Sequence, residues 1–463
     1  MTAPSVIVVG AGPAGVRAAE TLVRAGLRPL VLDEAPRAGG QIYRRAPATI
    51  RRPERAVYGF DAGRAKRIHA AFDAIRPDVF YRPDTIVWDA SERRLHFVSE
   101  GTPGSAPWDG LILATGAIDR VIPFPGWTQP GVYTLGAAQV ALKFQASVIG
   151  KRPVFFGTGP LLYLAAYQYL KAGVRPAAVL DTATAGAKFR AVPRLALHGM
   201  EVLLKGLFYL SALRLSGVSI VSGVSPIGVA RGEDGTLEGF RWQDRRGRRH
   251  RTECEALAFG FHLASQTQLA DLVGVDFAFD PVQRQWLPRQ DGFGRALGRE
   301  HVYLAGDGAQ VLGAEAAELT GEQAALSLLE DFGFPIDQRQ RDRLTSGIDR
   351  AIRMRHVLDG EMFPYPVDLA RATNDDVMIC RCEGVTAGTL RHAGRELGAT
   401  DLNHAKAFTR LGMGRCQGRV CGAAAAEILA STLGRPVERT GRLRGQAPVK
   451  PISLAVLAGA QRP

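Results

Sequence analysis

Three short runs of consecutive apolar residues stand out along the chain, and each precedes a glycine turn and a helical pattern. They cover residues 6–9 (VIVV), 153–156 (PVFF) and 302–305 (VYLA). A run without polar alternation, bounded by turn residues, is typical of a strand buried on both faces, as in a parallel sheet covered by helices. The pattern therefore predicts an α/β fold built from strand–turn–helix units.

The second of these units resembles the first. In both, a glycine (Gly26 or Gly173) lies sixteen residues after the first glycine of the turn. Such an internal duplication predicts two nucleotide-binding domains in one chain. Between the two units, residues 85–90 and 94–99 alternate in polarity, which predicts a small antiparallel sheet.

The first glycine turn carries the features of a dinucleotide site. The sequence VIVVGAGPAG places Gly10, Gly12 and Gly15, with Pro13 and Ala14, between a strand and a helical run. The first glycine permits the tight turn, the second lets the backbone approach a pyrophosphate, and the third allows close helix–strand packing. The helix N-terminus offers free N–H groups and partial positive charge to the phosphates.

Acidic residues follow where a dinucleotide's ribose is held. The run of residues 30–32 ends in Asp33 and Glu34, and Gly40 and Gln41 come shortly after. A carboxylate at this distance from the glycines can accept hydrogen bonds from the ribose hydroxyls. Because strand, glycines, helix and acid stand in register, we expect the N-terminal domain to bind a dinucleotide.

The second glycine turn departs from this pattern. It keeps Gly157 and Gly159, but Leu162 stands where the third glycine would be. A leucine there should push helix and strand apart or force a different packing. Asp181 is available for a ribose. Whether this domain binds NAD(P), another adenine nucleotide or nothing stays open.

Four of the five cysteines lie close to the C-terminus. Cys380, Cys382, Cys416 and Cys421 form a C-x-C-x33-C-x4-C pattern, whereas Cys254 stands alone in a predicted strand and reads as a buried, inert thiol. Four clustered cysteines in a chain without an export signal favour a metal site over disulfides. The choice lies between zinc and an iron–sulfur cluster. Zinc sites prefer C-x2-C pairs, so we expect a [2Fe-2S] cluster.

Charge and hydropathy narrow the class of protein. The net charge of +13 comes from scattered arginines without an aromatic-interleaved basic stripe, so nucleic-acid binding is not expected. The most apolar stretch, residues 202–215, is interrupted by Lys205 and Arg214, so no membrane span is expected. The chain enters a strand at once, which leaves no room for a signal peptide, and we expect a cytoplasmic protein.

Two further segments resemble those of the two-dinucleotide-domain flavoproteins. They are Ala114-Thr115-Gly116 after an apolar strand, and YLAGDG with Gly306 and Asp307 near the end of the core. In that superfamily the late aspartate lies against the ribityl and pyrophosphate part of a flavin. The resemblance implies that the bound dinucleotide is FAD.

At greater length the chain resembles one family of flavoprotein subunits. The segments GGQIYR, ATGAIDRVIPFPGW, GPLLYLAA, CRCEGVTAG and GMGRCQGRVCG carry the likeness. The family comprises the A (alpha) subunits of opine oxidases and D-hydroxyproline dehydrogenase and the matching subunit of hydrogen cyanide synthase. The N-terminal part is also similar to the alpha subunit of sarcosine oxidase. The cysteine module resembles the [2Fe-2S] domain of bacterioferritin-associated ferredoxin.

The resemblance implies an α/β architecture with two dinucleotide-binding domains and a small helical C-terminal domain. A Rossmann-like FAD domain would carry an inserted, second Rossmann-like domain that is degenerate in its NAD(P) motif. The expected boundaries are 1–120 and 271–330 for the FAD domain, 121–270 for the insertion, 331–374 for a linker with a helix, 375–436 for the [2Fe-2S] domain and 437–463 for a tail.

The resemblance further implies an electron-transfer subunit of a heteromeric dehydrogenase. A D-amino-acid-oxidase-like flavoprotein partner would oxidise the C–N bond of an amino acid, imino acid or opine, and electrons would leave to an external acceptor. A second flavin (FMN) at a subunit interface and a small ferredoxin-like subunit are compatible with this resemblance. Two alternatives remain: a self-sufficient NAD(P)H-dependent reductase, and a non-catalytic FAD scaffold with zinc. The chain itself offers no convincing catalytic residue; His262 reads as a packing residue, and Tyr43 is only a candidate neighbour of the flavin ring.

Overall fold

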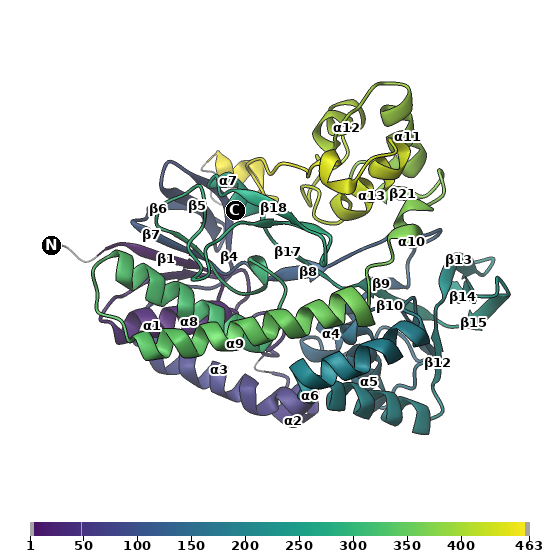
Figure 1. Cartoon of the computed structure of the whole chain (residues 1–463), viewed down its shortest axis with the longest axis horizontal. Helices are drawn as coiled ribbons and strands as arrows, with labels where there is room; N and C mark the ends of the chain where they lie inside the picture. Colours follow the sequence, from purple (N-terminus) through teal and green to yellow (C-terminus); the bar gives the residue numbers. More distant parts are fainter. Residues whose placement is uncertain (1–3, 48, 459–463) are drawn as a thin grey trace.

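The first sheet is built from the apolar runs of the sequence. In the computed structural model, which describes residues 4–47 and 49–458, five parallel strands lie in the order β20-β7-β1-β2-β3 (Figure 1). β1 and β7 are buried along their whole length, because both faces of the sheet are covered. The strands are β1 (Val6–Val9), β2 (Leu30–Leu32), β3 (Phe80–Arg82), β7 (Gly110–Leu113) and β20 (Val302–Leu304).

Helices cover one face of this sheet and a small antiparallel sheet covers the other. Gly321 in α8 packs so closely on α1 that a Cβ there would collide with the carbonyl of Ala14. The opposite face carries β4-β5-β6, the antiparallel sheet expected from the alternation of residues 85–99. The elements are α1 (Pro13–Arg24), α2 (Glu54–Tyr58), α3 (Ala62–Ile75), α8 (Ala314–Asp331), β4 (Thr85–Ser91), β5 (Arg94–Ser99) and β6 (Thr102–Pro107).

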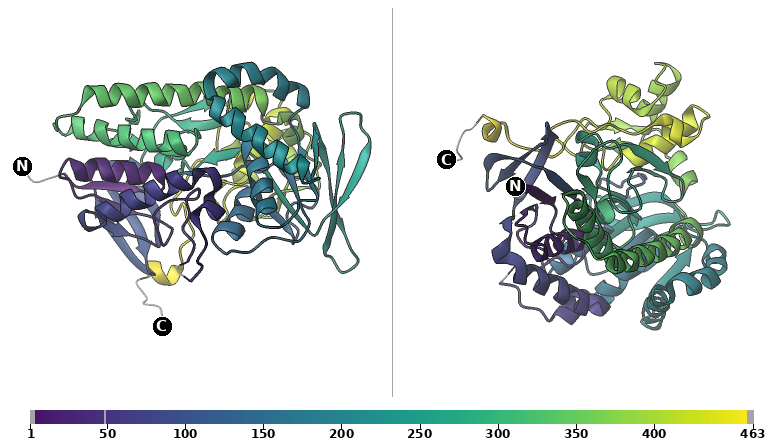
Figure 2. Two further views of the ribbon diagram at one scale, coloured as in Figure 1. Left: turned by 90° about the horizontal axis from the view of Figure 1, so that it is seen from below. Right: turned by 60° about the vertical axis from the view of Figure 1, so that its left-hand side comes forward.

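The second sheet repeats this plan, as the glycine spacing predicts. Its five parallel strands lie in the order β12-β11-β10-β16-β9, with α4, α5 and α6 on one face and the antiparallel sheet β13-β14-β15 on the other. The β14–β15 hairpin projects from the molecule (Figure 2). The elements are β9 (Val132–Thr134), α4 (Leu135–Lys143), β10 (Pro153–Thr158), α5 (Pro160–Lys171), β11 (Ala178–Asp181), α6 (Ala185–Leu215), β12 (Ser219–Ser222), β13 (Ser225–Arg231), β14 (Leu237–Gln243), β15 (Arg249–Glu253) and β16 (Ala256–Phe261).

Two short strands mark where the chain passes between the sheets. β8 (Ala117–Asp119) and β17 (Leu263–Ser265) pair antiparallel, and α7 (Gln268–Leu272), β18 (Phe277–Asp280) and β19 (Gln285–Pro288) follow. The buried guanidinium of Arg120 donates to the carbonyls of Gln283 (2.6 Å) and Arg284 (2.7 Å) and lies 3.7 Å from the ring centroid of Tyr365. These two hydrogen bonds and the contact with the aromatic ring hold the buried cation in place and fix the crossing.

The C-terminal part forms a small helical module on top of the two sheets in the view of Figure 1. Its core is separate from those of the sheets and includes Cys380 and Cys421. The buried carboxylate of Glu427 ties the module to the body through Arg284 (2.7 Å) and Arg371 (3.1 Å). The elements of the module are α10 (Val367–Arg371), β21 (Met378–Cys380), β22 (Val385–Thr386), α11 (Ala387–Arg395), α12 (Leu402–Thr409) and α13 (Gly422–Thr432). Outside the module, α9 (Gln338–His356) packs along α8 in the body, and α14 (Leu454–Leu457) lies beside β6.

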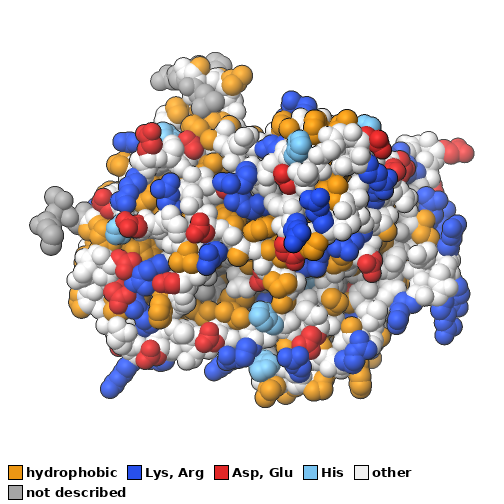
Figure 3. Space-filling view, turned by 45° about the horizontal axis from the view of Figure 1, so that its top comes forward, with side chains coloured by type: hydrophobic (Ala, Val, Ile, Leu, Met, Phe, Trp, Pro, Cys, Tyr) orange, Lys and Arg blue, Asp and Glu red, His pale blue; other side chains and the backbone are white. Residues whose placement is uncertain are grey.

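Charge is mixed over the surface. On the face shown in Figure 3, Lys and Arg side chains are interspersed with Asp and Glu. The net charge of +13 is therefore spread over the chain and does not form one field of a single sign on this face.

Leu162 is the residue that distinguishes the second unit from the first. Its side chain is fully buried in one core cluster with Phe155 and Tyr169. The leucine on α5 therefore fills part of the hydrophobic core. We expect Leu162→Ala to destabilise the protein by about 3 kcal/mol, because a buried leucine leaves a cavity. Urea denaturation measures this, with Phe189→Ala as a control at a side chain that is 80% exposed. Equal losses in both variants would contradict the assignment.

Candidate functional site

A long cleft runs along one edge of the first sheet toward the second unit. Its volume is about 740 Å³, and residues that follow the carboxyl ends of β1, β2, β7 and β20 line it. In open α/β sheets this edge is where ligands bind. Thirteen of the fourteen residues expected from the sequence to hold the dinucleotide line the cleft: Gly10, Gly12, Pro13, Ala14, Asp33, Glu34, Gly40, Gln41, Ala114, Thr115, Gly116, Gly306 and Asp307.

The three motif glycines have three different surroundings. A Cβ at Gly10 would collide with the carbonyl of Ala114, and one at Gly15 would collide with the carbonyl of Gly10. These two glycines are therefore required by backbone packing, and Gly15 lies beneath the cleft. A Cβ at Gly12 would meet only the Cα of Gly40, at 3.7 Å. Backbone packing alone therefore does not require a glycine at position 12. The side of Gly12 on which a Cβ would stand faces the cleft.

The two acidic residues after β2 are held differently. Asp33 accepts hydrogen bonds from the backbone N–H groups of Ala11 and Ala35 (2.6 Å to the latter). Burial raises the pKa of Asp33 to about 6, although these N–H groups oppose the shift. Glu34 is more exposed and forms an ion pair with Lys450 from the C-terminal segment. Both carboxylates line the same end of the cleft.

The middle of the cleft is fixed by Thr115 and Asp307. The hydroxyl of Thr115 donates to the carbonyl of Gln266 (2.6 Å). Asp307 accepts from the N–H groups of Leu312 (3.0 Å) and Gly313 (3.1 Å), and burial raises its pKa. These bonds hold Thr115 against the segment that follows β17, and Asp307 against the loop that follows β20.

Several cleft residues carry no signal in the sequence. Lys143, at the C-terminal end of α4, is buried, and burial lowers its pKa to about 8. Its Nζ lies 3.4 Å from the carbonyl of Ile42. Arg355 from α9 reaches the same cleft and donates to Asp359 (2.6 Å). Arg419 and Lys450 line the cleft from the C-terminal part. All four come from segments far from the glycine motif.

Tyr43 and His262 are packing residues. Tyr43 is not a neighbour of the cleft: it is 1% exposed and packs edge-to-face on Tyr58, while Gln41 and Ile42 face the cleft. Tyr43 was only a candidate neighbour of the flavin ring, and it does not line the cleft. His262 bonds to the carbonyl of Phe363 through Nε2 (2.6 Å), and its Nδ1 lies 3.2 Å from Asp359.

In the second unit, the carboxylate that could hold a ribose already has hydrogen-bond partners within the protein. Asp181 is fully buried and accepts from the hydroxyl of Tyr163 (2.6 Å) and the Nζ of Lys188 (2.8 Å), with the N–H of Ala183 on its other oxygen. Lys188 comes from the first turn of α6. A ribose would have to displace this ion pair, so the geometry does not favour a dinucleotide at the second glycine turn.

The four late cysteines meet in two pairs. The thiol of Cys421 donates to the sulfur of Cys380; this bond and the backbone N–H groups of Gly412, Glu383 and Cys382 lower the pKa of Cys380 to about 6 against the effect of burial. Cys382 and Cys416 form the second pair. Cys254 lies elsewhere, in the core of the second unit, where burial raises its pKa to about 12.

These residues fit a two-iron cluster. A [2Fe-2S] cluster takes two thiolates on each iron, and N–H groups aimed at sulfur stabilise its negative charge. A Cβ at Gly414 would collide with Cys382, so the loop around the sulfurs requires glycine there. Among the residues that the structure describes, no three His, Cys, Asp or Glu side chains converge on a single-ion position, as a tetrahedral zinc requires.

Residues 442–450, which we call the strap, join the cysteine module to the cleft. Arg442 and Arg444 bind the buried carboxylate of Asp271 (2.7 and 3.0 Å), which also accepts from the N–H of Gly445 (2.6 Å). Burial opposes the charge on Asp271, but these bonds together lower its pKa. Arg419, in the loop between Cys416 and Cys421, donates to the carbonyls of Cys416 (2.9 Å) and Val449 (3.0 Å).

The strap sets the orientation of the two sites. Val449 donates to the carbonyl of Trp88 (2.9 Å), and Lys450 pairs with Glu34. The cysteine loop therefore adjoins the acidic end of the cleft, where Asp33 and Glu34 lie, and not the end at Lys143.

Comparison with known proteins agrees with this architecture. Residues 4–323 match the model of the pyridine nucleotide-disulphide oxidoreductase family, and residues 378–431 match the BFD-like [2Fe-2S] binding domain. The chain is 37% identical to the A subunit of opine oxidase from Rhizobium meliloti, covering 98% of this chain and 87% of that protein. It is 32% identical to the HcnB subunit of hydrogen cyanide synthase from Pseudomonas aeruginosa, covering 96% of each.

A solved structure supports the fold over nearly the whole chain. L-proline dehydrogenase from P. horikoshii superposes with a TM-score of 0.71 at 19% identity, covering 98% of this chain and 79% of that one. Together with the two family models, this confirms the expected α/β fold with a BFD-like [2Fe-2S] domain.

Gly12 offers a test that separates cofactor binding from folding. We expect Gly12→Ala to leave the melting temperature of the apoprotein nearly unchanged but to weaken FAD at least about tenfold, because a methyl group would stand where the pyrophosphate approaches. Fluorescence titration of the apoprotein with FAD measures the affinity. Gly26→Ala is the control, since Gly26 has a φ of +82° and open space around it. FAD affinity equal to the wild type would contradict the assignment.

Asp33 predicts a pH dependence of FAD affinity. In the apoprotein its pKa is about 6, and ribose hydroxyls that donate to the carboxylate would lower that pKa in the complex. The ionised form therefore binds better, so FAD affinity should rise with pH up to about 6, by no more than about tenfold per unit, and be flat above. Titrations from pH 5 to 8 test this. Asp33→Asn should remove the dependence, and a flat wild-type profile would contradict it.

The strap can be released by one substitution. Asp271→Asn removes a buried carboxylate from two arginines, and we expect a loss of about 3 kcal/mol in the stability of the module's docking. Limited proteolysis followed by mass spectrometry should then show faster cleavage near residues 442–450. The control is Asp73→Asn. This substitution breaks an ion pair with Arg45, but the side chain of Asp73 is 61% exposed, so little stability should be lost. Identical cleavage of both variants would rule out this role of Asp271.

Proposed function

The chain belongs to the family of opine oxidase A subunits and hydrogen cyanide synthase HcnB subunits, and we propose on this premise that it is the electron-transfer subunit of a heteromeric dehydrogenase. The proposed enzyme binds FAD and a [2Fe-2S] cluster in this chain and oxidises the C–N bond of an amino acid, imino acid or opine. The substrate site lies mainly in a partner subunit, and the complex is cytoplasmic.

The main support for this proposal is that the acidic side chains in the cleft already have hydrogen-bond or ion-pair partners. Within the described residues, four carboxylates line the cleft and each already has a partner: backbone N–H groups at Asp33, Asp119 and Asp307, and Lys450 at Glu34. A carboxylate that serves as a general base must be directed at the proton that it removes. Asp119 and Asp307 are instead turned toward backbone N–H groups, and the accepting positions left on Asp33 and Glu34 are those that we propose for the ribose. The cleft is thus arranged to hold a cofactor rather than to deprotonate a substrate.

Each group of cleft residues has one task in the proposal. The glycine turn and the N-terminus of α1 hold the pyrophosphate, Asp33 and Glu34 hold the ribose, and Gly40, Gln41, Ala114, Thr115, Gly116, Gly306 and Asp307 position the rest. Lys143 places a buried positive charge at the far end. When bound, a flavin takes electrons in pairs and releases them singly, and a [2Fe-2S] cluster carries one at a time. Cys380, Cys382, Cys416 and Cys421 are the proposed ligands.

The partners follow from the same premise. We propose a D-amino-acid-oxidase-like flavoprotein as the main partner. Further electron carriers are an external acceptor and a small ferredoxin-like subunit. A second flavin, FMN, between the two large subunits is a compatible addition. The cysteine loop adjoins the end of the cleft that we assign to the ribose, through Arg419, Val449 and Lys450.

The alternatives meet specific obstacles. A self-sufficient NAD(P)H reductase needs a working second dinucleotide site, but Asp181 is bound to Tyr163 and Lys188. A zinc scaffold is opposed by the match of residues 378–431 to the BFD-like [2Fe-2S] binding domain. Disulphide reduction, which the name of the wider family suggests, needs a pair of cysteines at the flavin, and the sequence has none near Gly40.

Anaerobic reduction tests the proposal. The complex, isolated with its partner, is mixed with octopine, nopaline or D-hydroxyproline in one set of experiments and with NADH in another. We expect one of the C–N substrates to bleach the flavin absorbance and NADH to leave it unchanged. Rapid bleaching by NADH would favour the reductase.

Substitution of a single cysteine tests the cluster ligands. We expect Cys416→Ser to lose the iron and acid-labile sulfide while most of the FAD remains, because the two sites lie in different parts of the fold. Cys254→Ser is the matched control and should keep both groups, since Cys254 is a buried core residue. Full iron content in Cys416→Ser would remove this residue from the ligand set.

A further inference from the structure

Helix α6 presents an unusual number of apolar side chains to solvent. We call them, together with Phe60 beside them, the α6 face; their exposed fractions range from 43% at Phe208 to 89% at Leu215. The members on α6 are Phe189, Leu197, Met200, Leu204, Leu207, Phe208 and Leu215. α6 bends at the non-helical Gly199. The five members beyond this bend, from Met200 to Leu215, are spaced by one, three, four or seven residues, so they share one face of the second half of the helix.

The extent of this face exceeds what a free monomer commonly shows. With exposed fractions of about half or more, these eight side chains present on the order of 800 Å² of apolar surface, which is about one side of a standard protein interface. The largest apolar patch of a typical monomer covers roughly 300–600 Å². Some other surface must cover the α6 face in the working protein.

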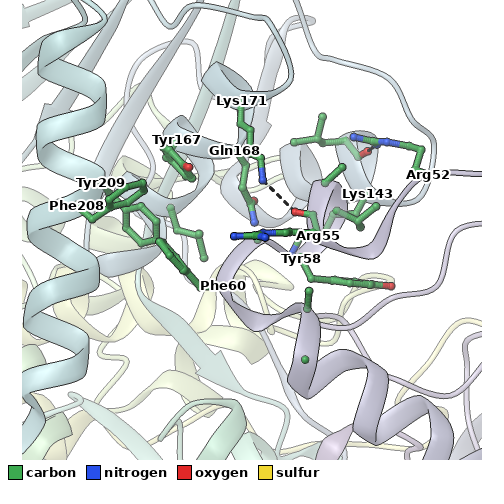
Figure 4. Close-up of a pocket in the computed structure, with 17 residues that line it drawn as sticks. Arg52, Arg55, Tyr58, Phe60, Lys143, Tyr167, Gln168, Lys171, Phe208 and Tyr209 are labelled. Atoms are coloured by element: carbon green, nitrogen blue, oxygen red, sulfur yellow. Dashed lines mark hydrogen bonds between the residues drawn. The ribbon is translucent and has the colours of Figure 1, made fainter.

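The face borders a pocket at the boundary of the two units. Phe60 packs on Phe208 with ring centroids 5.0 Å apart, and Tyr167 packs on Tyr209 at 5.0 Å (Figure 4). The pocket measures about 550 Å³, and the charged side chains that line it are all basic: Arg52, Arg55, Lys143 and Lys171. Lys143 also lines the dinucleotide cleft, so the pocket adjoins the end of the cleft opposite the cysteine loop.

We propose that the α6 face is the docking surface for the partner subunit, which presents to it an apolar ridge rimmed by Asp and Glu. This inference rests on the proposed function, in which the chain works as a subunit. The charges around the face argue for an acidic rim: the exposed charged residues of α6 are Arg190, Arg194, Arg214 and a single acid, Glu201. The partner then also covers the basic pocket next to the flavin end of the cleft.

A second copy of the chain and a membrane are less suitable occupants. A two-fold pairing of α6 faces would bring the arginines of both copies together, in a chain that already carries a net charge of +13. By length and composition alone α6 could span a membrane. However, Pro193 and the non-helical Gly199 (φ −157°, ψ 54°) bend it, and a concave basic pocket beside it fits a protruding group of a protein better than a flat lipid surface.

The test compares two substitutions at apolar side chains of similar exposure. Leu204 on the α6 face is 58% exposed and Phe80, on the edge strand β3, is 54% exposed. Wild type, Leu204→Glu and Phe80→Glu are each produced together with the partner that copurifies at fixed stoichiometry with the wild type. Native mass spectrometry gives the composition of each complex, and the absorbance of FAD and the cluster shows that the chain is folded.

We expect Leu204→Glu to weaken the complex at least about thirtyfold, as for a residue at the centre of an interface, and to emerge alone with FAD and iron bound. Phe80→Glu should keep the partner. A Leu204→Glu complex of unchanged composition would overturn the docking surface and leave the proposed function standing. If the wild type copurifies with no partner, the proposed function fails and this inference fails with it.

Two measurements on the purified chain alone address the other occupants. In the first, the chain is sedimented with phosphatidylcholine/phosphatidylglycerol vesicles. If the wild type binds the vesicles and Leu204→Glu does not, the α6 face is a membrane-binding surface. A dimer of the wild type that Leu204→Glu dissociates would assign it to a second copy. Either result, with the partner still bound to Leu204→Glu, would overturn the proposal.

Discussion

Close backbone contact at three glycines is the constraint on which the rest of the structure depends. Gly10 and Gly15 bring the turn after β1 against Ala114 and onto itself, and Gly321 brings α8 onto α1, with no room for a Cβ at any of the three. These contacts pack α1 and α8 closely together and against the first sheet. The edge at the carboxyl ends of its strands therefore stays open and is lined by backbone N–H groups. The dinucleotide cleft is therefore a consequence of packing, and Gly12 is the member of the motif left free to face a ligand.

The sequence was informative wherever function depends on local motifs. The strands, the duplicated units, the antiparallel sheet and most cleft residues follow from runs and turns that are contiguous in the chain. Lys143, Arg355, Arg419 and Lys450 could not be found in this way, because they reach the cleft from distant segments. Tyr43, which the sequence offered only as a candidate, shows that neighbours in sequence need not face the same way: Ile42 lines the cleft and Tyr43 fills the core. The predicted domain boundaries remain predictions.

The second unit shows how a nucleotide-binding fold can be kept for another purpose. Leu162 fills the space of the missing glycine, and Lys188 neutralises Asp181 in the position of a ribose acid. The second unit contributes surface instead: α6 carries the apolar face, and α4 supplies Lys143 to the cleft. The basic pocket lies between this unit and the first. The strap performs the corresponding task at the other end, where it binds the cysteine module to the first unit through Asp271.

The central claim is that one chain holds a flavin in the first unit and a two-iron cluster between the two cysteine pairs. Its most direct test is the stoichiometry of the protein purified anaerobically from iron-replete cells, by flavin absorbance, iron and acid-labile sulfide assays and metal analysis. The account predicts about one FAD, two irons and two sulfides per chain. Zinc without sulfide, or a colourless protein, would contradict it.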